Sequence, residues 1–242
     1  MVRLYHPRPA HTLSPTDDLL SYQLIIVPSL VLVDEAIVAK LQKASERGAT
    51  VVITCMTGLR TPEMKSFGSM LNKQIASLAG ISMEEQFSLI KQETTAIQFG
   101  NNINTQTCSQ WFDVFNPLQT IVLATYQSRF LKGKPTIVRN NANKGAVYYI
   151  GTIPSDELTD MVIKAAVSDA KIVPLATANN KLVDITELQQ GKKRYAYLIN
   201  FSQEPQPITI SKPMKDILSG EKLTQQTTVA PMEVKVLEVG QE

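Results

Sequence analysis

Residues 22–54 constrain the fold most, because two short apolar runs there flank a stretch with helical periodicity. The runs occupy residues 24–27 and 51–53, and their apolar residues are continuous rather than alternating. Asp34 is suited to cap the helix between them, and Gly48 to end it. Continuous apolar strands are typical of a parallel sheet that helices cover on both faces. The segment therefore predicts a strand, a helix and a strand of an α/β domain.

The patterns that follow are weaker up to residue 120 and then become regular again. A polar turn at 143–145 separates two apolar runs, which is typical of a β-hairpin. Ser155 precedes an acidic first turn and an apolar face, which is typical of a helix start. The predicted elements are, in order, a helix over about 62–80, strands over 95–99, 111–115 and 120–126, a hairpin of 136–140 with 147–151, and a helix over 155–170.

Beyond Pro174 the helical period disappears, and short runs separated by turn residues follow at a spacing of roughly ten residues. This spacing predicts a small antiparallel β-sandwich. We therefore expect two domains, residues 1–174 and residues 175–242. A complete barrel of eight βα units is not expected, because the chain has at most three or four such units. The predicted sandwich strands are 182–185, 195–201, 208–210, 222–224 and 234–239.

The balance of charges argues against several classes of partner. The chain has 242 residues with 24 Lys and Arg against 22 Asp and Glu, which gives a net charge of +2. A balance so close to neutral predicts neither a nucleic acid nor an anionic membrane as a partner. The sequence contains no run of 18 apolar residues and no pattern of a signal peptide. Two cysteines form no disulfide framework, so we expect a reducing, cytoplasmic location.

Cys55 is the most reactive residue type at a position that suits catalysis. It ends an apolar strand and precedes Gly58, and a sharp turn from strand to helix there would expose its sulfur. A catalytic cysteine also needs a base. Both histidines, His6 and His11, lie upstream, whereas cysteine hydrolases with such an elbow place the histidine downstream. A structural cysteine at a strand end is therefore the favoured interpretation, and Cys108 is assigned to packing.

Metal and cofactor sites find little support in the sequence. His6 and His11 are five residues apart and are followed by Asp17 and Asp18, which are potential zinc ligands. The segment is rich in proline and lacks the helical spacing of paired ligands, so an extended lead-in is favoured over a metal site. Neither a G-x-G-x-x-G nor a G-x-x-x-x-G-K-[ST] motif occurs, so no phosphate-binding loop and no cofactor are predicted.

Several stretches, taken in order, resemble one known family. They are SYQLIIVPSLVLVDEAIVAKLQKASERGATVVIT, GKPTIVRNNANKGAVYYIGT, RYAYLINFSQEPQPITI, KDILSGE and VKVLEV. Together they resemble the C-terminal part of glycoside hydrolase family 42 β-galactosidases over nearly the whole chain. The resemblance implies a flavodoxin-like, class I amidotransferase-like trimerisation domain with three layers and a mainly parallel sheet. A small all-β sandwich domain would follow it.

The resemblance also implies that the catalytic barrel of the family lies outside this chain. Retaining glycosidases need two carboxyl groups about 5–5.5 Å apart. In this family the acid/base glutamate follows an asparagine, and the sequence contains no Asn-Glu dipeptide. The first strand and helix of the flavodoxin-like domain also have no counterpart before Tyr5, so we expect an N-terminally incomplete domain. No catalytic and no metal-binding residue is therefore assigned to this chain.

The favoured hypothesis is a non-catalytic assembly module of a β-galactosidase-like enzyme that hydrolyses terminal β-D-galactosides. The resemblance implies a homotrimer in the parent enzyme, with the galactoside bound by the absent barrel. Arg60 and Trp111 are candidates for an interface or a pocket wall, because they lie in loops after or between strands. The alternative is a cysteine-dependent hydrolase or amidotransferase relative that uses Cys55. Carbohydrate binding by the sandwich is a third hypothesis, but Tyr195, Tyr197 and Phe201 fit a core better.

Overall fold

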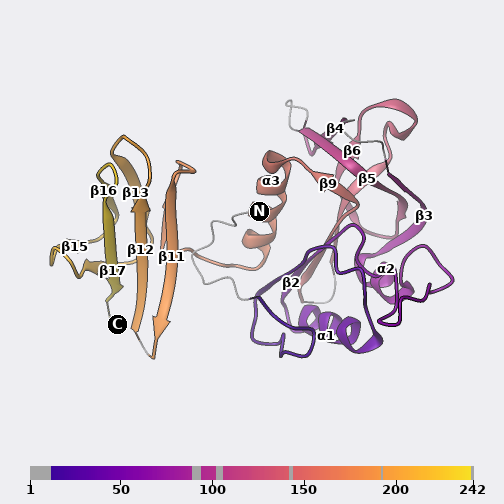
Figure 1. The fold of residues 1–242 in the computed structure, drawn as a ribbon, viewed down its shortest axis with the longest axis horizontal. Coiled ribbons are helices and arrows are strands. Elements are labelled where there is room, and N and C mark those ends of the chain that lie inside the picture. Colours follow the sequence, from indigo (N-terminus) through magenta and orange to yellow (C-terminus); the bar gives the residue numbers. More distant parts are fainter. Residues whose placement is uncertain (1–11, 89–93, 102–105, 142–143, 192, 241–242) are drawn as a thin grey trace. The chain divides into compact units, whose positions relative to one another are not determined.

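The chain folds into two compact units, residues 14–172 and a unit that contains residues 173–242. The computed structural model describes residues 12–88, 94–101, 106–141, 144–191 and 193–240, so His6 and His11 lie outside the described residues. The elements of the first unit (Figure 1) are β1 (Leu24–Val27), α1 (Glu35–Glu46), β2 (Thr50–Thr54), α2 (Lys73–Ala79), β3 (Ile81–Ser88), β4 (Thr94–Phe99), β5 (Gln106–Pro117), β6 (Ile121–Tyr126), the 3-10 helix η1 (Arg129–Leu131), β7 (Pro135–Asn140), β8 (Ala146–Ile150), β9 (Thr152–Pro154) and α3 (Asp156–Asp169).

The strand, helix and strand predicted at the start are confirmed. β1 pairs with β2 in parallel, with Ile25 opposite Val51. The helix α1 begins after Asp34, whose carboxylate accepts a hydrogen bond of 2.8 Å from the amide of Ile37. This cap satisfies one of the amides that the first turn of a helix leaves unpaired. The hairpin of β7 and β8 and the helix α3, capped by Ser155, also match the sequence patterns.

The prediction of a flavodoxin-like, amidotransferase-like three-layer domain with a mainly parallel sheet is wrong. Among the described residues, one sheet has the order β1-β2-β8-β7-β6-β4-β5-β3, with β9 paired to β5. Only β1, β2 and β8 run parallel, and every further pair in this sheet is antiparallel. The chain as described has three α-helices and is mostly β-structure. Residues 81–119, which the sequence pattern left irregular apart from short strands at 95–99 and 111–115, form β3, β4 and β5, and their antiparallel pairing changes the fold class.

The second predicted helix is also much shorter than expected. Its pattern predicts a helix over about 62–80, but α2 begins only after Asn72, whose side chain accepts from the amides of Gln74 and Ile75. Residues 55–72 form turns instead, because Pro62 and Gly68 interrupt the run. At the other end Gly80 has a φ of 68° and closes the helix in the left-handed conformation.

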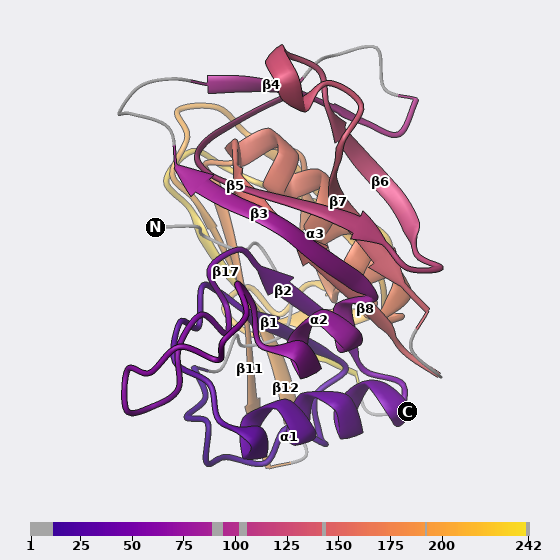
Figure 2. The same ribbon diagram turned by 90° about the vertical axis from the view of Figure 1, so that its right-hand side faces the viewer.

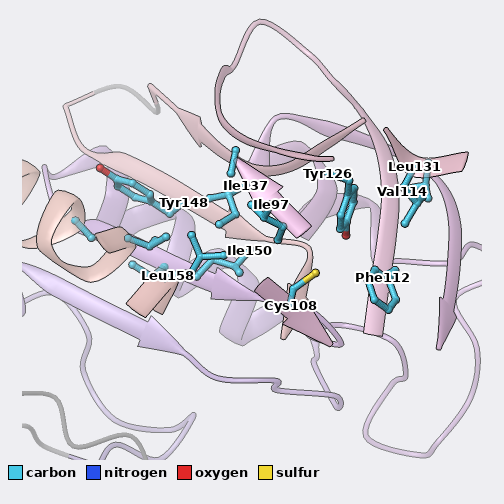
Figure 3. Close-up of a cluster of buried hydrophobic side chains, with 14 of the residues drawn as sticks. Ile97, Cys108, Phe112, Val114, Tyr126, Leu131, Ile137, Tyr148, Ile150 and Leu158 are labelled. Carbon is cyan, nitrogen blue, oxygen red and sulfur yellow. The ribbon is translucent and has the colours of Figure 1, made fainter. Parts of the chain in front are cut away.

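The core of the first unit packs α3 against one face of the sheet (Figure 3). Leu158, Val162 and Ala166 of α3 cluster with Val52 and Tyr148 of the central strands. Side chains alternate along a strand, so the neighbours of Val52 point to the other face, where α1 and α2 lie next to each other (Figure 2). The helices therefore cover the parallel end of the sheet.

The second unit contains two antiparallel sheets, in agreement with the turn spacing of the sequence. Its strands are β10 (Ala176–Ala178), β11 (Val183–Gln190), β12 (Lys193–Asn200), β13 (Gln206–Ile210), β14 (Met214–Asp216), β15 (Lys222–Leu223), β16 (Gln226–Val229) and β17 (Val234–Val239). One sheet has the order β10-β13-β16 and the other β11-β12-β17-β14-β15.

The orientation of β12 differs from the expectation. Ala196 and Leu198 are fully buried and belong to the core of this unit. Tyr195 and Tyr197 alternate with them and therefore point to the opposite face, where they are half-buried. The prediction that these tyrosines form the core is wrong, because Ala196 and Leu198 face inward instead.

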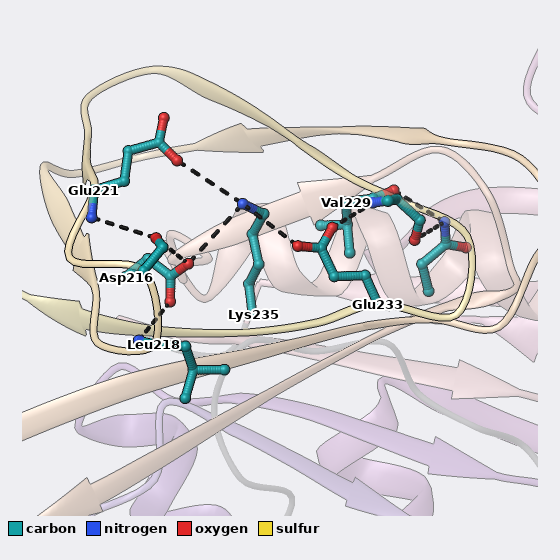
Figure 4. A network of polar contacts seen from close by, with 9 residues as sticks. Asp216, Leu218, Glu221, Val229, Glu233 and Lys235 are labelled. Carbon is teal, nitrogen blue, oxygen red and sulfur yellow. Dashed lines mark hydrogen bonds and ion pairs between the residues drawn. The ribbon is translucent and has the colours of Figure 1, made fainter.

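An enclosed lysine lies among three carboxylates in the second unit (Figure 4). The Nζ atom of Lys235 in β17 is 4.0 Å from Asp216, 3.9 Å from Glu221 and 3.8 Å from Glu233. The side chain of Lys235 is 11% exposed and that of Asp216 is 3% exposed. The enclosed positive charge is thus met by negative charges on three sides.

Asp216 accepts two further hydrogen bonds in this cluster. The amide of Leu218 donates to it over 3.0 Å, and the hydroxyl of Ser219 over 2.7 Å. Burial pushes the pKa of Asp216 upward, but these hydrogen bonds and the charge of Lys235 outweigh it and hold the pKa below its usual value. Asp216 is therefore held in its ionised form.

Candidate functional site at the carboxyl edge of the parallel strands

The parallel strands end at a common edge of the sheet, and this edge carries the residues singled out from the sequence. β1, β2 and β8 run parallel, so their carboxyl ends lie side by side. Open sheets bind ligands and partners preferentially outside the carboxyl ends of parallel strands. Ser29 follows β1 with a φ of 47°, and Met56 follows β2 with a φ of 66°. Left-handed backbone at residues other than glycine carries strain and is concentrated at functional sites.

Two threonines join the loops after β1 and β2. The hydroxyl of Thr54 accepts a hydrogen bond of 2.8 Å from the amide of Ser29, and the hydroxyl of Thr57 accepts one of 3.2 Å from the amide of Leu30. The amide of Gly58 donates back to the carbonyl of Leu30 over 2.8 Å. These bonds fix the two loops relative to each other.

A buried carboxylate, Asp113 of β5, lies next to this edge. Its side chain accepts hydrogen bonds from the hydroxyl of Tyr149 at 2.7 Å, from the indole nitrogen of Trp111 at 2.8 Å and from the amide of Gln86 at 2.9 Å. Asp113 is fully buried, and each of these three donors is neutral. Its backbone amide donates to the carbonyl of Gly151, directly after β8.

Burial shifts the pKa of Asp113 and also that of Tyr149, which donates the shortest of the three hydrogen bonds. Burial raises the pKa of Asp113, and the bonds from Tyr149, Trp111 and Gln86 counteract only part of that effect. Burial also raises the pKa of Tyr149 well above its usual value, and the charge of Asp113 adds to the shift. Asp113 is therefore a carboxylate held by neutral hydrogen bonds, with an elevated affinity for a proton.

The glycine at the end of β8 leaves the space that Asp113 occupies. A Cβ atom at Gly151 would lie 2.8 Å from the ring of Phe115 and 3.1 Å from the Cβ of Asp113. Real side chains do not pack that closely, so any larger residue at position 151 would push against Phe115 and Asp113 of β5.

Trp111 is held in place by three separate features. Its indole bonds to Asp113, and its carbonyl accepts a hydrogen bond of 2.7 Å from the hydroxyl of Thr152. The preceding residue, Gln110, has a φ of 66°, and the pairing of β5 with β9 shifts register between Ser109 and Phe112. Bulges of this kind redirect side chains and occur often beside functional sites. The half-buried Trp111 is therefore presented in a defined orientation.

Cys55 lies at the end of β2 but points into the protein. The side chain is 1% exposed, and its backbone amide donates to the carbonyl of Ile150 over 2.7 Å. Burial raises the pKa of Cys55 to about 12, and the negative charge of Asp113 adds to the shift. The strained residue at the apex of the turn is Met56, whose thioether is not a nucleophile. These features argue against a reactive thiolate at Cys55.

Arg60 lies in the loop after β2 and is exposed. Its amide donates to the carbonyl of Val31, and its carbonyl accepts from the amide of Val33, so the loops after β1 and β2 continue to pair. Its guanidinium donates to the carbonyl of Leu59 over 2.9 Å. Asp113 thus interacts with both Trp111, through a hydrogen bond, and Cys55, through its charge, whereas the contacts of Arg60 are to the two loops.

The described residues contain neither a candidate metal site nor a candidate membrane-spanning helix. No group of three or more His, Cys, Asp or Glu side chains in this part of the chain is placed to hold a metal ion. No helix in the same residues is long and apolar enough to cross a membrane.

Sequence patterns missed Asp113, Gln86 and Tyr149. A usable signal was present, because Asp113 is a lone carboxylate in the apolar run WFDVF. A charged residue inside a buried strand needs partners and so indicates a polar network. The partners themselves come from β3 and β8, and no local pattern gives that pairing.

Comparison with known proteins identifies the family. Residues 8–173 match the family model described as the β-galactosidase trimerisation domain, and this is more than half of the chain. The chain belongs to the glycoside hydrolase family 42 β-galactosidases. Residues 182–238 match the β-galactosidase C-terminal domain of the same family. The resemblance inferred from the sequence is therefore confirmed, and the chain carries the trimerisation and C-terminal domains of family 42 without its catalytic region.

Curated relatives and solved structures agree with this assignment. The chain is 23% identical to β-galactosidase GanA of Bacillus subtilis over 233 residues, which is 96% of this chain and 34% of the relative. It is 24% identical to β-galactosidase BgaA of Clostridium cellulovorans over 93% of this chain and 34% of that relative. The chain thus spans about a third of the length of the family 42 relatives that it matches.

The fold is also that of solved family 42 members. A catalytic mutant of Gan42B, a family 42 β-galactosidase from G. stearothermophilus, superposes with a TM-score of 0.85 at 21% identity, over 97% of this chain and 34% of that one. The β-galactosidase from Bacillus circulans sp. alkalophilus gives a TM-score of 0.84 at 22% identity, over 94% and 34%.

Proposed function

We propose that this chain is the assembly part of a β-galactosidase that hydrolyses terminal β-D-galactosides. Its role is to bring three subunits together and to hold their catalytic regions in place, so its contribution to turnover is positional. The observation that carries this proposal is the match of residues 8–173 to a domain described by trimerisation. The chain functions as two domains, residues 1–174 and 175–242, in the reducing environment of the cytoplasm, where its two free cysteines stay reduced.

Trp111 and Arg60 are the residues proposed to face a neighbouring subunit or to line the wall of its galactoside pocket. Trp111 is favoured because Asp113 and the bulge at Gln110 fix its indole in one orientation. An aromatic side chain that is already ordered loses little conformational entropy when it meets a partner. Arg60 is favoured because it is exposed at the carboxyl edge of the parallel strands.

The test is the mass of the purified chain in solution, measured by light scattering and by sedimentation over a wide range of concentration. We expect a species with three times the 26.8 kDa of one chain and no hydrolysis of a chromogenic galactoside. A chain that stays monomeric at every concentration, or that turns over the galactoside and loses this activity on a point change within it, would contradict the proposal.

A matched pair of variants tests the two residues. Trp111→Phe keeps an aromatic ring but loses the bond to Asp113, and Trp111→Ala loses both. We expect the alanine variant to weaken association more than the phenylalanine variant, while Arg60→Ala has a smaller effect because its side-chain contact lies within its own loop.

A further inference from the structure

An exposed phenylalanine, Phe130, lies at the tip of the short turn between β6 and β7. It belongs to the 3-10 helix η1, and its side chain is 71% exposed. Among the described residues it is the most exposed of the large apolar side chains. Its neighbour Leu131 is only 3% exposed and fixes the turn to the core. The turn thus buries one apolar residue and presents the next one to solvent.

Phe130 is the outermost of four aromatic rings that lead into the core. Its ring centroid is 5.6 Å from that of Phe87 in β3, and Phe87 stacks on Phe112 at 5.4 Å. Phe112 in turn contacts Tyr126 at 5.8 Å, and both of these rings are fully buried. Offset and tilted ring pairs at such distances are favourable. The ring of Phe130 is therefore packed against Phe87 in a defined position.

Hydrogen bonds hold both ends of the turn. The amide of Gln127 donates to the carbonyl of Ala96 over 2.8 Å, which ties the start of the turn to β4. The amides of Gly133 and Lys134 donate to the carbonyls of Tyr126 and Leu131, each over 2.8 Å, and close its end. A side chain on such a turn is ordered before it meets a partner, so little entropy is lost on binding.

We propose that Phe130, packed against Phe87, inserts into a second copy of this chain and anchors the contact between subunits. This inference rests on the proposed assembly function and names the surface that carries it. The partner is a second copy because Phe130 lies within residues 8–173, the part that matches a trimerisation domain. Aromatic residues with a rigid support are the ones that dominate protein interfaces, and they are costly to leave in water.

The symmetry of a closed trimer determines what Phe130 meets. In a ring of three, each subunit uses two different surfaces, one toward each neighbour. Away from the three-fold axis, where like residues meet, Phe130 of one subunit therefore enters a surface of the next subunit that does not contain that subunit's Phe130. A two-fold dimer would instead bring like surfaces together.

The first experiment measures association of the full chain by sedimentation, with Phe130→Ser as the test variant. Phe201→Ser is the matched control, because Phe201 is a phenylalanine 48% exposed in the other unit. We expect Phe130→Ser to raise the dissociation constant of the oligomer at least about 30-fold and Phe201→Ser to leave it unchanged. Circular dichroism and the melting temperature of the monomer confirm that both variants fold.

The outcomes separate this inference from the proposed function. A wild-type trimer that Phe130→Ser does not weaken, or that Phe201→Ser weakens equally, would overturn the role of Phe130 and leave the assembly function standing. A wild-type chain that never associates would overturn both.

A second experiment locates the receiving surface without relying on stability. Phe130 is replaced by the photoreactive benzoyl-phenylalanine, the full chain is irradiated, and the cross-linked peptides are identified by mass spectrometry. We expect covalent bonds between chains, from position 130 to a peptide that does not contain it. A probe at position 201 should give no bond between chains. The absence of cross-links between chains at position 130, or equally abundant cross-links between chains from position 201, would refute the inference.

Discussion

The two units enclose an aspartate in opposite ways. In the first unit Asp113 is fully buried and accepts hydrogen bonds only from the neutral groups of Tyr149, Trp111 and Gln86. In the second unit Asp216 lies 4.0 Å from the ammonium group of Lys235. The pKa is raised for Asp113 and lowered for Asp216. Burial raises the pKa of both carboxyl groups, and at Asp113 it prevails over the three neutral hydrogen bonds. At Asp216 the hydrogen bonds from Ser219 and Leu218, followed by the charge of Lys235, outweigh burial.

This difference has a structural consequence. Neutral donors orient Trp111 and Tyr149 without adding a charge to the dry region next to the parallel strands. The lysine cluster instead keeps Asp216 ionised between the strands of the C-terminal unit. We therefore expect the first arrangement to act on side-chain orientation and the second to act on stability near neutral pH.

The largest expected effect is on the chemistry of Cys55, beside Asp113. With its pKa raised to about 12, the thiol at pH 8 forms roughly 1000-fold less thiolate than a free cysteine. We expect alkylation by iodoacetamide in the folded chain to be slower by a similar factor than in the urea-unfolded chain, as measured by mass spectrometry. Rapid alkylation of native Cys55 would show that this region is not dry and would revive the cysteine-hydrolase alternative.

Replacing Asp113 by leucine should have the next largest effect. The change leaves the indole of Trp111 and the fully buried hydroxyl of Tyr149 without their acceptor, at a cost of about 3–5 kcal/mol. Urea unfolding of the full chain measures the loss. Asp113→Asn is the matched control, since it keeps the size and an acceptor oxygen and should cost less than about 1.5 kcal/mol. Equal losses for the two variants would mean that the hydrogen bonds are not the cause.

Replacing Lys235 by methionine should cost about 2 kcal/mol, because it leaves the enclosed Asp216 without its positive neighbour. The loss is smaller than at Asp113 because Glu221 and Glu233 are themselves 58% and 38% exposed. The double variant Lys235→Met with Asp216→Asn removes both charges and should recover part of the stability. Absence of any recovery would show that the methylene groups of Lys235, rather than its charge, stabilise the sheet.

The contributions of the two aspartates to the pH dependence of stability should have opposite signs. Asp113 has a raised pKa in the folded state, so its favourable contribution is present at low pH and is lost as pH rises above about 4. Asp216 has a lowered pKa, so its contribution is present above about pH 4 and is lost as pH falls. Melting temperatures of wild type, Asp113→Asn and Asp216→Asn from about pH 3 to 7 test this. Parallel curves for the two variants would contradict the comparison.

The smallest effect is expected for the surface ion pair of Lys134 and Glu84. The two side chains are 44% and 40% exposed and 3.3 Å apart. Exposed pairs of this kind contribute little to stability, because water and salt screen the two charges. Lys134→Ala should therefore leave the free energy of unfolding nearly unchanged, and added salt should remove any remaining difference. A loss as large as that of Lys235→Met would show that enclosure does not distinguish the two pairs.

Local patterns could predict the elements whose residues agree with one period. The helix after Asp34 and the helix after Ser155 each combine a capping side chain with an apolar face, and both begin as predicted. The apolar runs of β1 and β2 were equally readable. In these segments propensity, capping and burial all favour the same structure.

Among the antiparallel strands of the first unit, β4, β6 and part of β5 were predicted, whereas β3 was missed because its residues do not alternate cleanly. β3 contains the adjacent exposed residues Glu84 and Glu85, and its pairing with β5 shifts register between Met83 and Glu85. A bulge of this kind removes the period of two on which strand prediction depends. The same limit applies to the candidate site, since Asp113 was visible in the sequence but the pairing that brings Gln86 to it was not.

β3 lies at the end of the strand order and carries those two glutamates beside an irregular register. An outer strand that is charged and bent offers a poor template for another sheet. A protein that forms a finite oligomer must not add further copies without limit, because unlimited addition produces fibres. The glutamates of β3 would oppose such growth in the plane of the sheet, which agrees with the proposed assembly into a closed ring.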